Sequence, residues 1–191
     1  MKKPILVLAL LAATAAPVLA ANPPPQMQPR ILLIDRQAIL RGSKVGQDVA
    51  KQVQGYADQA KADIAGQQKA LQSEAQQLQQ QVSILAADAR QKKVQAFEAK
   101  QQGMQAAAQR REASIQGGFM KAQATIAQTL EPILQTIMQQ RGANMILDKN
   151  ALVYASPDAV KAFDITQPAI DQLNQKLPNL KVNLAPPPGQ K

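Results

Sequence analysis

Few side chains in this sequence are of the kinds that carry out catalysis. The 191-residue chain has no histidine and no cysteine, and no nucleophile-elbow, phosphate-loop or dinucleotide-binding glycine pattern. Carboxylates remain, but Asp35 and Asp148 each end an apolar run, where a charged residue commonly meets solvent or caps a turn. We therefore expect no catalytic residue, no metal ligand and no cofactor, and interpret the protein as a non-enzyme.

Two other groups of side chains suit binding rather than catalysis. Arg90, Lys92 and Lys93 form a dense positive cluster that would attract anionic lipid or lipopolysaccharide; the alternative is a solvated turn that keeps the chain soluble. Larger apolar side chains follow at Phe97, Met104, Phe119 and Met120. Flexible apolar groups of this kind can contact partners of varied shape, although packing between helices is the alternative.

These residues lie on two long helical patterns. Apolar residues recur every seven positions in the first, at Ala50, Ala57, Ile64, Leu71, Leu78 and Leu85, which predicts a coiled-coil seam. A second stripe runs in steps of three and four from Val94 to Ile137. We expect an antiparallel helical hairpin with residues 85 and 89 opposite each other and a first helix roughly 60 Å long.

A small body is predicted at the base of this hairpin. Residues 31–35 and 144–148 are short apolar runs that suit buried strands, and 151–155 suits a third strand after a turn at 149–150. Thr166 is expected to cap a last helix that continues to Leu177. The strands are apolar on both faces, which predicts an oligomer interface formed by Ile31, Leu33, Met145, Leu147, Leu152 and Tyr154.

Proline and glycine residues mark possible breaks in the helices. Pro132 is expected to kink the second helix near the junction of arm and body, and Gly142 to end it. Five further glycines interrupt the helices and either permit close helix packing or let the arm bend: Gly55, Gly66, Gly103, Gly117 and Gly118.

The ends of the sequence indicate export. Residues 1–20 resemble a signal peptide with cleavage after Ala20, followed by a proline-rich linker at 21–29. Removing Lys2 and Lys3 leaves 20 of the 22 basic residues against 13 acidic ones, a net charge of +7. Such a charge favours anionic partners, but we expect no nucleic acid because an exported protein does not meet it. The tail, 178–191, is expected to be flexible.

In its order of motifs the chain resembles the Skp/OmpH family of periplasmic chaperones. The likeness covers residues 30–177: ILLIDRQAIL at the first strand, a glutamine-rich helical hairpin, then GANMILDKNALVYASPDAVKAFDIT. The resemblance implies a homotrimer shaped like a jellyfish, with helical arms around a cavity. It also implies an ATP-independent holdase for unfolded outer-membrane proteins. The arms depart from the family pattern in having many Gln and Ala residues and a modest charge.

Together these observations predict an α+β protein, mostly α, exported to the periplasm. Residues 30–45 and 127–177 would form the body and oligomerisation region, and residues 46–126 the arm. Client proteins would contact Phe97, Met104, Phe119 and Met120. A coiled-coil spacer of the cell envelope is the alternative function, although a spacer would favour an uninterrupted, strongly apolar seam.

Overall fold

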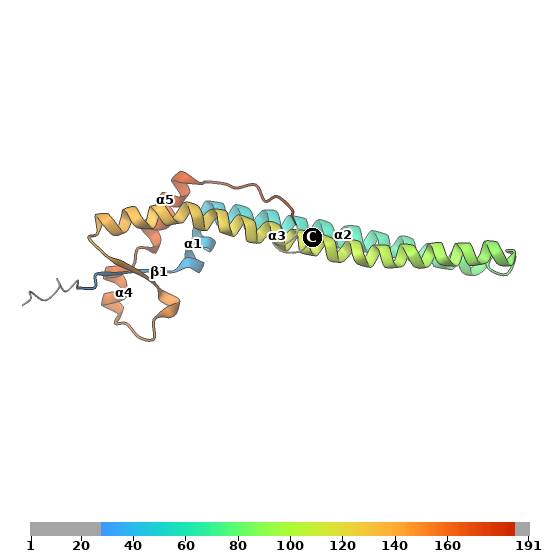
Figure 1. The fold of residues 1–191 in the computed structure, drawn as a ribbon, viewed down its shortest axis with the longest axis horizontal. Helices are drawn as coiled ribbons and strands as arrows, with labels where there is room; N and C mark the ends of the chain where they lie inside the picture. The colour runs from blue at the N-terminus through green and yellow to red at the C-terminus, as the bar shows by residue number, and fades with distance from the viewer. Residues whose placement is uncertain (1–27, 186–191) are drawn as a thin grey trace, which may run out of the picture.

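The computed structural model describes residues 28–185 of the chain. Two long helices lie side by side as an arm, and the shorter elements gather around one end of that arm as a body (Figure 1). This mostly helical fold with one small sheet confirms the predicted α+β class. The signal peptide and most of the proline-rich linker lie outside the described residues. Among the described helices, none combines the length and hydropathy of a membrane span.

The sheet has two parallel strands that are far apart in the sequence. Strand β1 (Ile31–Ile34) pairs with β2 (Met145–Asp148), so that Ile31 lies opposite Met145. The turn before β2 is fixed by Asn144, whose Oδ1 accepts from the backbone N–H of Arg30 at 2.8 Å. Gly142 follows helix α3 (Ala87–Gln140) with a φ of +61°, the left-handed conformation that glycine adopts freely. The strands predicted at 31–35 and 144–148 are therefore confirmed.

The predicted third strand at 151–155 is wrong. The Asp148 carboxylate accepts from the backbone N–H of Asn150 at 3.0 Å, and Lys149–Ala151 form a single 3₁₀ turn (η1) that directs the chain away from β2. A short helix that the sequence analysis missed, α4 (Pro157–Phe163), follows next. Ser156 caps it and Pro157 occupies its first turn, which is a recognisable helix start.

The core lies where the inner ends of the long helices meet the body. Helix α1 (Arg36–Gly42) leads into α2 (Lys44–Gln81), the outgoing helix of the arm, and α3 (Ala87–Gln140) returns. Helix α5 (Thr166–Lys176) packs against α1 and α3. Buried apolar side chains from all of these elements form one cluster, which includes Ile39, Val45, Val49, Ile126, Ile133 and Leu173. Helix α3 continues through Pro132 without interruption.

Thr166 does not cap the last helix as expected. Ile165 occupies the cap position, and the Thr166 hydroxyl oxygen instead accepts from the backbone N–H of Asp35 at 2.9 Å. Asp35 itself caps α1 by accepting from the backbone N–H of Ala38. The hydroxyl therefore ties the start of α5 to the start of α1 rather than closing its own helix.

The expectation of a flexible tail is wrong for residues 178–185, which we name the strap. The strap leaves α5 and runs back along the arm (Figure 1). Val182 within it is 1% exposed and belongs to the core cluster. Side chains of α2 satisfy the strap's backbone hydrogen bonds, so the segment is held without forming a helix or strand.

Two ion pairs join the end of β2 to its neighbours. Asp148 accepts from Arg36 at 3.0 Å, and Asp164 from Lys149 at 2.7 Å. The backbone hydrogen bond from Asn150 lowers the pKa of Asp148, opposed by partial burial and aided by Arg36. Burial would raise the pKa of Asp164, but hydrogen bonds from Lys149 and Thr166 outweigh it and leave this pKa below its ordinary value.

We expect acid to weaken the body through these two carboxylates. Because both pKa values are lower in the folded protein than the ordinary value of 3.8, their stabilisation is present above about pH 4 and is lost as pH falls through the folded values. Asp164→Asn should reduce the slope of unfolding free energy against pH below 4, measured by urea unfolding. Asp158→Asn, at an exposed position of α4, is the control, and an unchanged slope in Asp164→Asn would contradict the assignment.

Candidate functional site

The arm is an antiparallel pair of helices in a single register. Side chains meet across it at Lys93 and Gln81, at Lys100 and Glu74 (2.7 Å), and at Arg111 and Asp63 (3.6 Å). In each pair the two residue numbers add to 174, as do 85 and 89. The last two of these contacts are exposed ion pairs, which contribute little stability. They therefore fix the alignment of the helices more than they hold the helices together.

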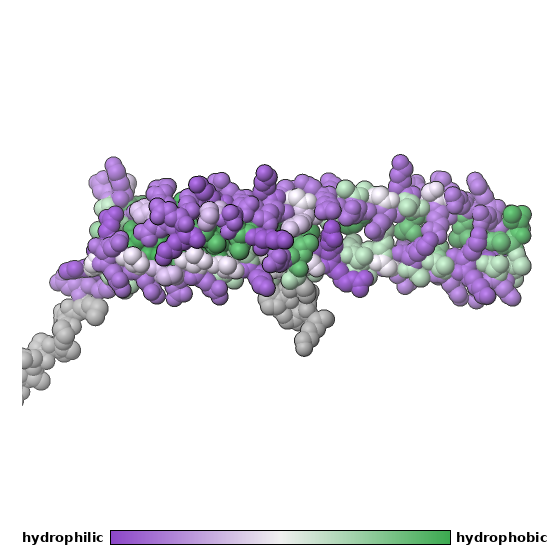
Figure 2. Space-filling view, turned by 90° about the horizontal axis from the view of Figure 1, so that it is seen from above, coloured by the Kyte–Doolittle hydropathy of each residue, from purple (hydrophilic) through white to green (hydrophobic). Residues whose placement is uncertain are grey.

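The outer arm has no sealed core. From residue 50 to residue 116 none of the side chains is buried: of the seam residues of α2 and the tip, Ile64, Leu71, Leu78 and Leu85 are half-buried, and Ala50 and Ala57 are exposed. Figure 2 shows the result as hydrophobic patches that interrupt a hydrophilic surface along the arm and at its tip. Apolar groups that are only half covered still gain free energy when a further apolar surface covers them.

Three of the four predicted contact residues line separate hollows between the helices. Phe97 lines a hollow of about 200 Å³ near the tip, Met104 one of about 350 Å³ further in, and Phe119 one of about 360 Å³ at the base. Met120 lines none of these three; its side chain is 37% exposed. The structure thus spreads the predicted residues along the arm and does not gather them into one pocket.

A fourth hollow in the middle of the arm was missed by the sequence analysis. Its volume is about 490 Å³, and small side chains form much of its lining, with Ala57, Ala60 and Ala108 beside Ile64 and Ile115. Alanine cannot fill the space between two helices as leucine does. The signal was present in the sequence, because Ala57 occupies a heptad position of the seam.

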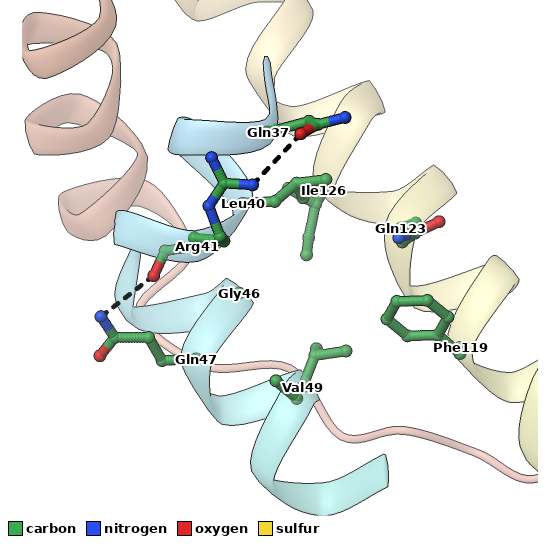
Figure 3. A pocket seen from close by; sticks show the side chains of 10 residues that line it. Gln37, Leu40, Arg41, Gly46, Gln47, Val49, Phe119, Gln123 and Ile126 are labelled. Atoms are coloured by element: carbon green, nitrogen blue, oxygen red, sulfur yellow. Dashed lines mark hydrogen bonds between the residues drawn. The ribbon is translucent and has the colours of Figure 1, made fainter. Parts of the chain in front are cut away.

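The hollow at the base has an apolar floor and a polar rim (Figure 3). Phe119, Val49 and Ile126 supply apolar surface, and Gln123 lies at the edge. The rim is ordered by hydrogen bonds, since Arg41 donates to the Gln37 side chain and Gln47 donates to the Arg41 carbonyl, both at 3.2 Å. Such a site contacts apolar groups without demanding one particular ligand shape.

The three predicted basic residues lie just after the turn at the tip. The turn spans residues 82–86, and α3 begins at Ala87 without a side-chain cap. Arg90 donates to the Leu85 carbonyl at 3.3 Å and Lys93 to the Gln81 side chain. Lys92 is exposed. The positive charge therefore sits at the far end of the arm, beside Ile84, which is 82% exposed.

The residues predicted at the oligomer interface differ in accessibility. Met145 and Tyr154 are 43% and 86% exposed, whereas Leu33 is 4% exposed within the single chain. Ile31, Leu147 and Leu152 are half-buried. Val153, which was not among the predicted interface residues, is fully exposed. The interface itself stays a prediction.

The arm glycines now divide into two kinds. A methyl group added at Gly55, Gly66 or Gly103 would meet no other atom within 4 Å, so close helix packing does not explain these three. At Gly118 the same methyl group would lie 2.7 Å from the Asn183 carbonyl oxygen of the strap. For the three outer glycines bending stays a prediction, whereas close approach explains Gly118.

These features define a class of protein in which a long, half-packed helical arm projects from a small α+β body. Within residues 28–185, no three Asp or Glu side chains gather as a metal site. The chain belongs to the OmpH-like outer membrane protein family, whose sequence pattern matches residues 30–173.

One solved structure shares the fold over nearly the whole chain. It is the crystal structure of a candidate outer membrane chaperone, OmpH-like, from Caulobacter crescentus CB15, with a TM-score of 0.75 and 22% sequence identity. The similarity covers 91% of this chain and 100% of the other. No curated protein sequence matches the chain. Membership of the family supports a chaperone role in general terms.

We expect the outer glycines to keep the arm pliable. Replacing Gly55, Gly66 and Gly103 together by Ala should stabilise the arm, because each change favours helix by about 1 kcal/mol and meets open space. Amide hydrogen exchange should slow in residues 50–110. Exchange that stays the same or becomes faster would show that the glycines have another role.

Proposed function

We propose that the protein is an ATP-independent holdase of the periplasm that keeps unfolded outer-membrane proteins soluble. The observation that carries this proposal is the outer arm, where no side chain from residue 50 to residue 116 is buried. A holdase needs apolar surface that stays accessible without collapsing on itself. The arm provides this because its helix pairing leaves hollows rather than a closed seam.

Many weak contacts suit this function better than one tight pocket. Each hollow is shallow and chemically simple, so a contact at Phe97 or Met104 alone would bind weakly. An unfolded chain that touches several hollows gains avidity through the high effective concentration of the later contacts. Release then needs no nucleotide, because each contact breaks easily when the client begins to fold elsewhere.

A homotrimer would enclose the client between three arms. Association would cover the exposed side chains of Met145 and Tyr154 on the body, and apolar surface that gathers into a contiguous exposed patch often marks an interaction site. Half-buried Ile31, Leu147 and Leu152 would add to the interface. The arms would then project in one direction and surround a common cavity.

A structural spacer is the weaker alternative. A spacer holds a fixed length and favours a closed, strongly apolar seam. This arm instead has glycines in open space at Gly55, Gly66 and Gly103 and a hollow of about 490 Å³ at its middle. Both features make the length and curvature of the arm variable.

Light scattering coupled to size exclusion tests the proposal directly. The mature protein should elute with the mass of three chains, and with that mass plus one client after mixing with a urea-unfolded outer-membrane β-barrel protein. A client that aggregates as it does alone would overturn the holdase proposal. A monomer that still holds the client would overturn only the trimer.

The hollows, rather than exposed apolar groups in general, should determine capture. Phe97→Gln together with Met104→Gln should raise by a few-fold the amount of protein needed to suppress client aggregation, measured by turbidity. Ile84→Gln is the matched control, because Ile84 is the more exposed at 82% but lines none of the hollows described above. An equal loss from the control would indicate general surface hydrophobicity instead.

The basic tip should steer the arm toward anionic lipid or lipopolysaccharide. Reversing Arg90, Lys92 and Lys93 to Glu should reduce binding to phosphatidylglycerol vesicles at low salt, where charges act over roughly 30 Å, and should matter little at 1 M salt. Reversal of three other exposed cations gives the same net charge as a control: Lys51, Lys69 and Lys121. Equal effects of the two triple variants would assign the attraction to net charge alone.

A further inference from the structure

The strap is held on the arm partly through its backbone. Gln52 donates from Nε2 to the Leu180 carbonyl and accepts at Oε1 from the Val182 N–H, both at 2.9 Å. Asp48 accepts from the Leu180 N–H at 3.2 Å, and the Tyr56 hydroxyl donates to the Val182 carbonyl at 3.3 Å. These four hydrogen bonds involve no side chain of the strap, so they do not depend on its sequence.

The spacing of these contacts matches an extended peptide. Asp48, Gln52 and Tyr56 follow one another at intervals of four residues, which places them about 6 Å apart along α2. The strap advances by two residues, from Leu180 to Val182, over one such interval. An extended chain rises about 3.3 Å per residue, so two residues of the strap span about the same length as four residues of α2.

The Gln52 side chain is oriented by a hydrogen bond within α2 as well as by the strap. Its Nε2 also donates to the Asp48 carboxylate at 2.9 Å, which sets the direction of the amide group and leaves Oε1 toward the peptide. A side-chain amide held in this way offers one donor and one acceptor, as a neighbouring β-strand would. Preorganisation of this kind lowers the cost of binding.

The side chains at positions 180–183 of the strap alternate between the arm and solvent, whereas Leu184 is 37% exposed. Val182 is buried at 1% and Leu180 is half-buried, whereas Lys181 and Asn183 between and beyond them are exposed. Gly118 permits this close seating, because a methyl group there would lie 3.2 Å from the Val182 side chain and 2.7 Å from the Asn183 carbonyl oxygen. The surface thus accepts an apolar side chain at alternate positions.

We infer that this surface, which we name the strap groove and which is formed by Asp48, Gln52, Tyr56 and Gly118, is a binding site for extended segments of unfolded polypeptide, occupied in cis by the strap. The segments that fit have alternating apolar and polar side chains. Transmembrane β-strands have that pattern, and so does the strap itself at 179–184, NLKVNL. That the partner is an outer-membrane protein rests on the proposed function. That the strap groove binds an extended peptide does not rest on it.

Occupation in cis makes the strap a competitor. A segment tethered next to its own site has an effective concentration in the millimolar range, so a single short peptide displaces it poorly. A long unfolded chain already held at the hollows of the outer arm has a similar advantage. The groove would therefore open to chains that the arm has captured and stay closed to free peptides.

A labelled peptide of strap sequence 178–185 tests the groove without any client. In the full chain, Val182→Asp should release the strap and allow the peptide to bind, measured by fluorescence anisotropy, with an affinity at least about tenfold higher than that of the unaltered protein. Val182→Pro, which removes the N–H that Gln52 accepts from, provides a second opened variant if Val182→Asp loses helical circular dichroism.

Matched variants locate the binding. Adding Gly118→Ala to the opened protein should abolish peptide binding, whereas Gly103→Ala, which meets open space, should preserve it. A peptide of the same composition with its apolar residues adjacent should not bind. The inference would be overturned if the opened variants failed to bind the peptide. It would also be overturned if Gly118→Ala left peptide binding unchanged, or if the rearranged peptide bound as tightly as the strap peptide. The two proteins should also have the same mass by light scattering. A larger mass for the unaltered protein than for Val182→Asp would show that straps are exchanged between copies and would overturn occupation in cis.

A client assay separates this inference from the holdase proposal. The Val182→Asp protein should suppress aggregation of an unfolded outer-membrane protein at a concentration a few-fold lower than the unaltered protein. Peptide binding without any client protection would leave the groove established and overturn the proposed function. Client protection without peptide binding would support the proposed function and overturn the inference of a binding site at the strap groove.

Discussion

The inner ends of α2 and α3 contribute most of the burial that holds the arm to the body. Val45 and Val49 from one helix and Ile126 and Ile133 from the other meet α5 in a cluster where these side chains are at most 2% exposed. Between residues 50 and 116 the pair buries no side chain completely, so the outer arm depends on this base for its alignment. A stable base permits an outer arm that is poorly packed, and under the proposed function this poor packing keeps apolar surface accessible to clients.

The two surfaces proposed for binding differ in their chemistry. The hollows of the outer arm offer apolar area with few oriented polar groups, and they suit chains of any local structure. The strap groove offers oriented hydrogen-bonding groups at Asp48, Gln52 and Tyr56 and suits only an extended chain. The strap groove and the hollow at the base share no lining residue. Under these two proposals one chain would have a surface for unspecific capture and a separate surface that selects backbone conformation.

The sequence predicted those elements whose signals are local. Buried runs predicted β1 and β2, and heptad spacing predicted the paired helices. The third strand failed because Lys149-Asn150 looks like a hairpin turn, while the deciding interaction is a single bond from the Asp148 carboxylate to the Asn150 N–H. The strap was missed because its partners Asp48 and Gln52 lie more than 120 residues away, and residues 178–185 alone have no periodicity long enough to indicate order. Gly118 differs from Gly103 only through a tertiary contact.

Parallel pairing of β1 with β2 has a consequence for the order of folding. Arg30 and Asn144, which bond beside the first strand pair, are 114 residues apart, and closing a flexible loop of that length would cost on the order of 4 kcal/mol in chain entropy. The arm removes most of that cost, because its helices form from local contacts and bring both ends of the segment together. We therefore expect the hairpin to form first and the sheet afterwards. Until then β1, three of whose four residues become buried, remains exposed, so a folding chain passes through a stage in which it resembles the unfolded proteins that the proposed function assigns to its own arm.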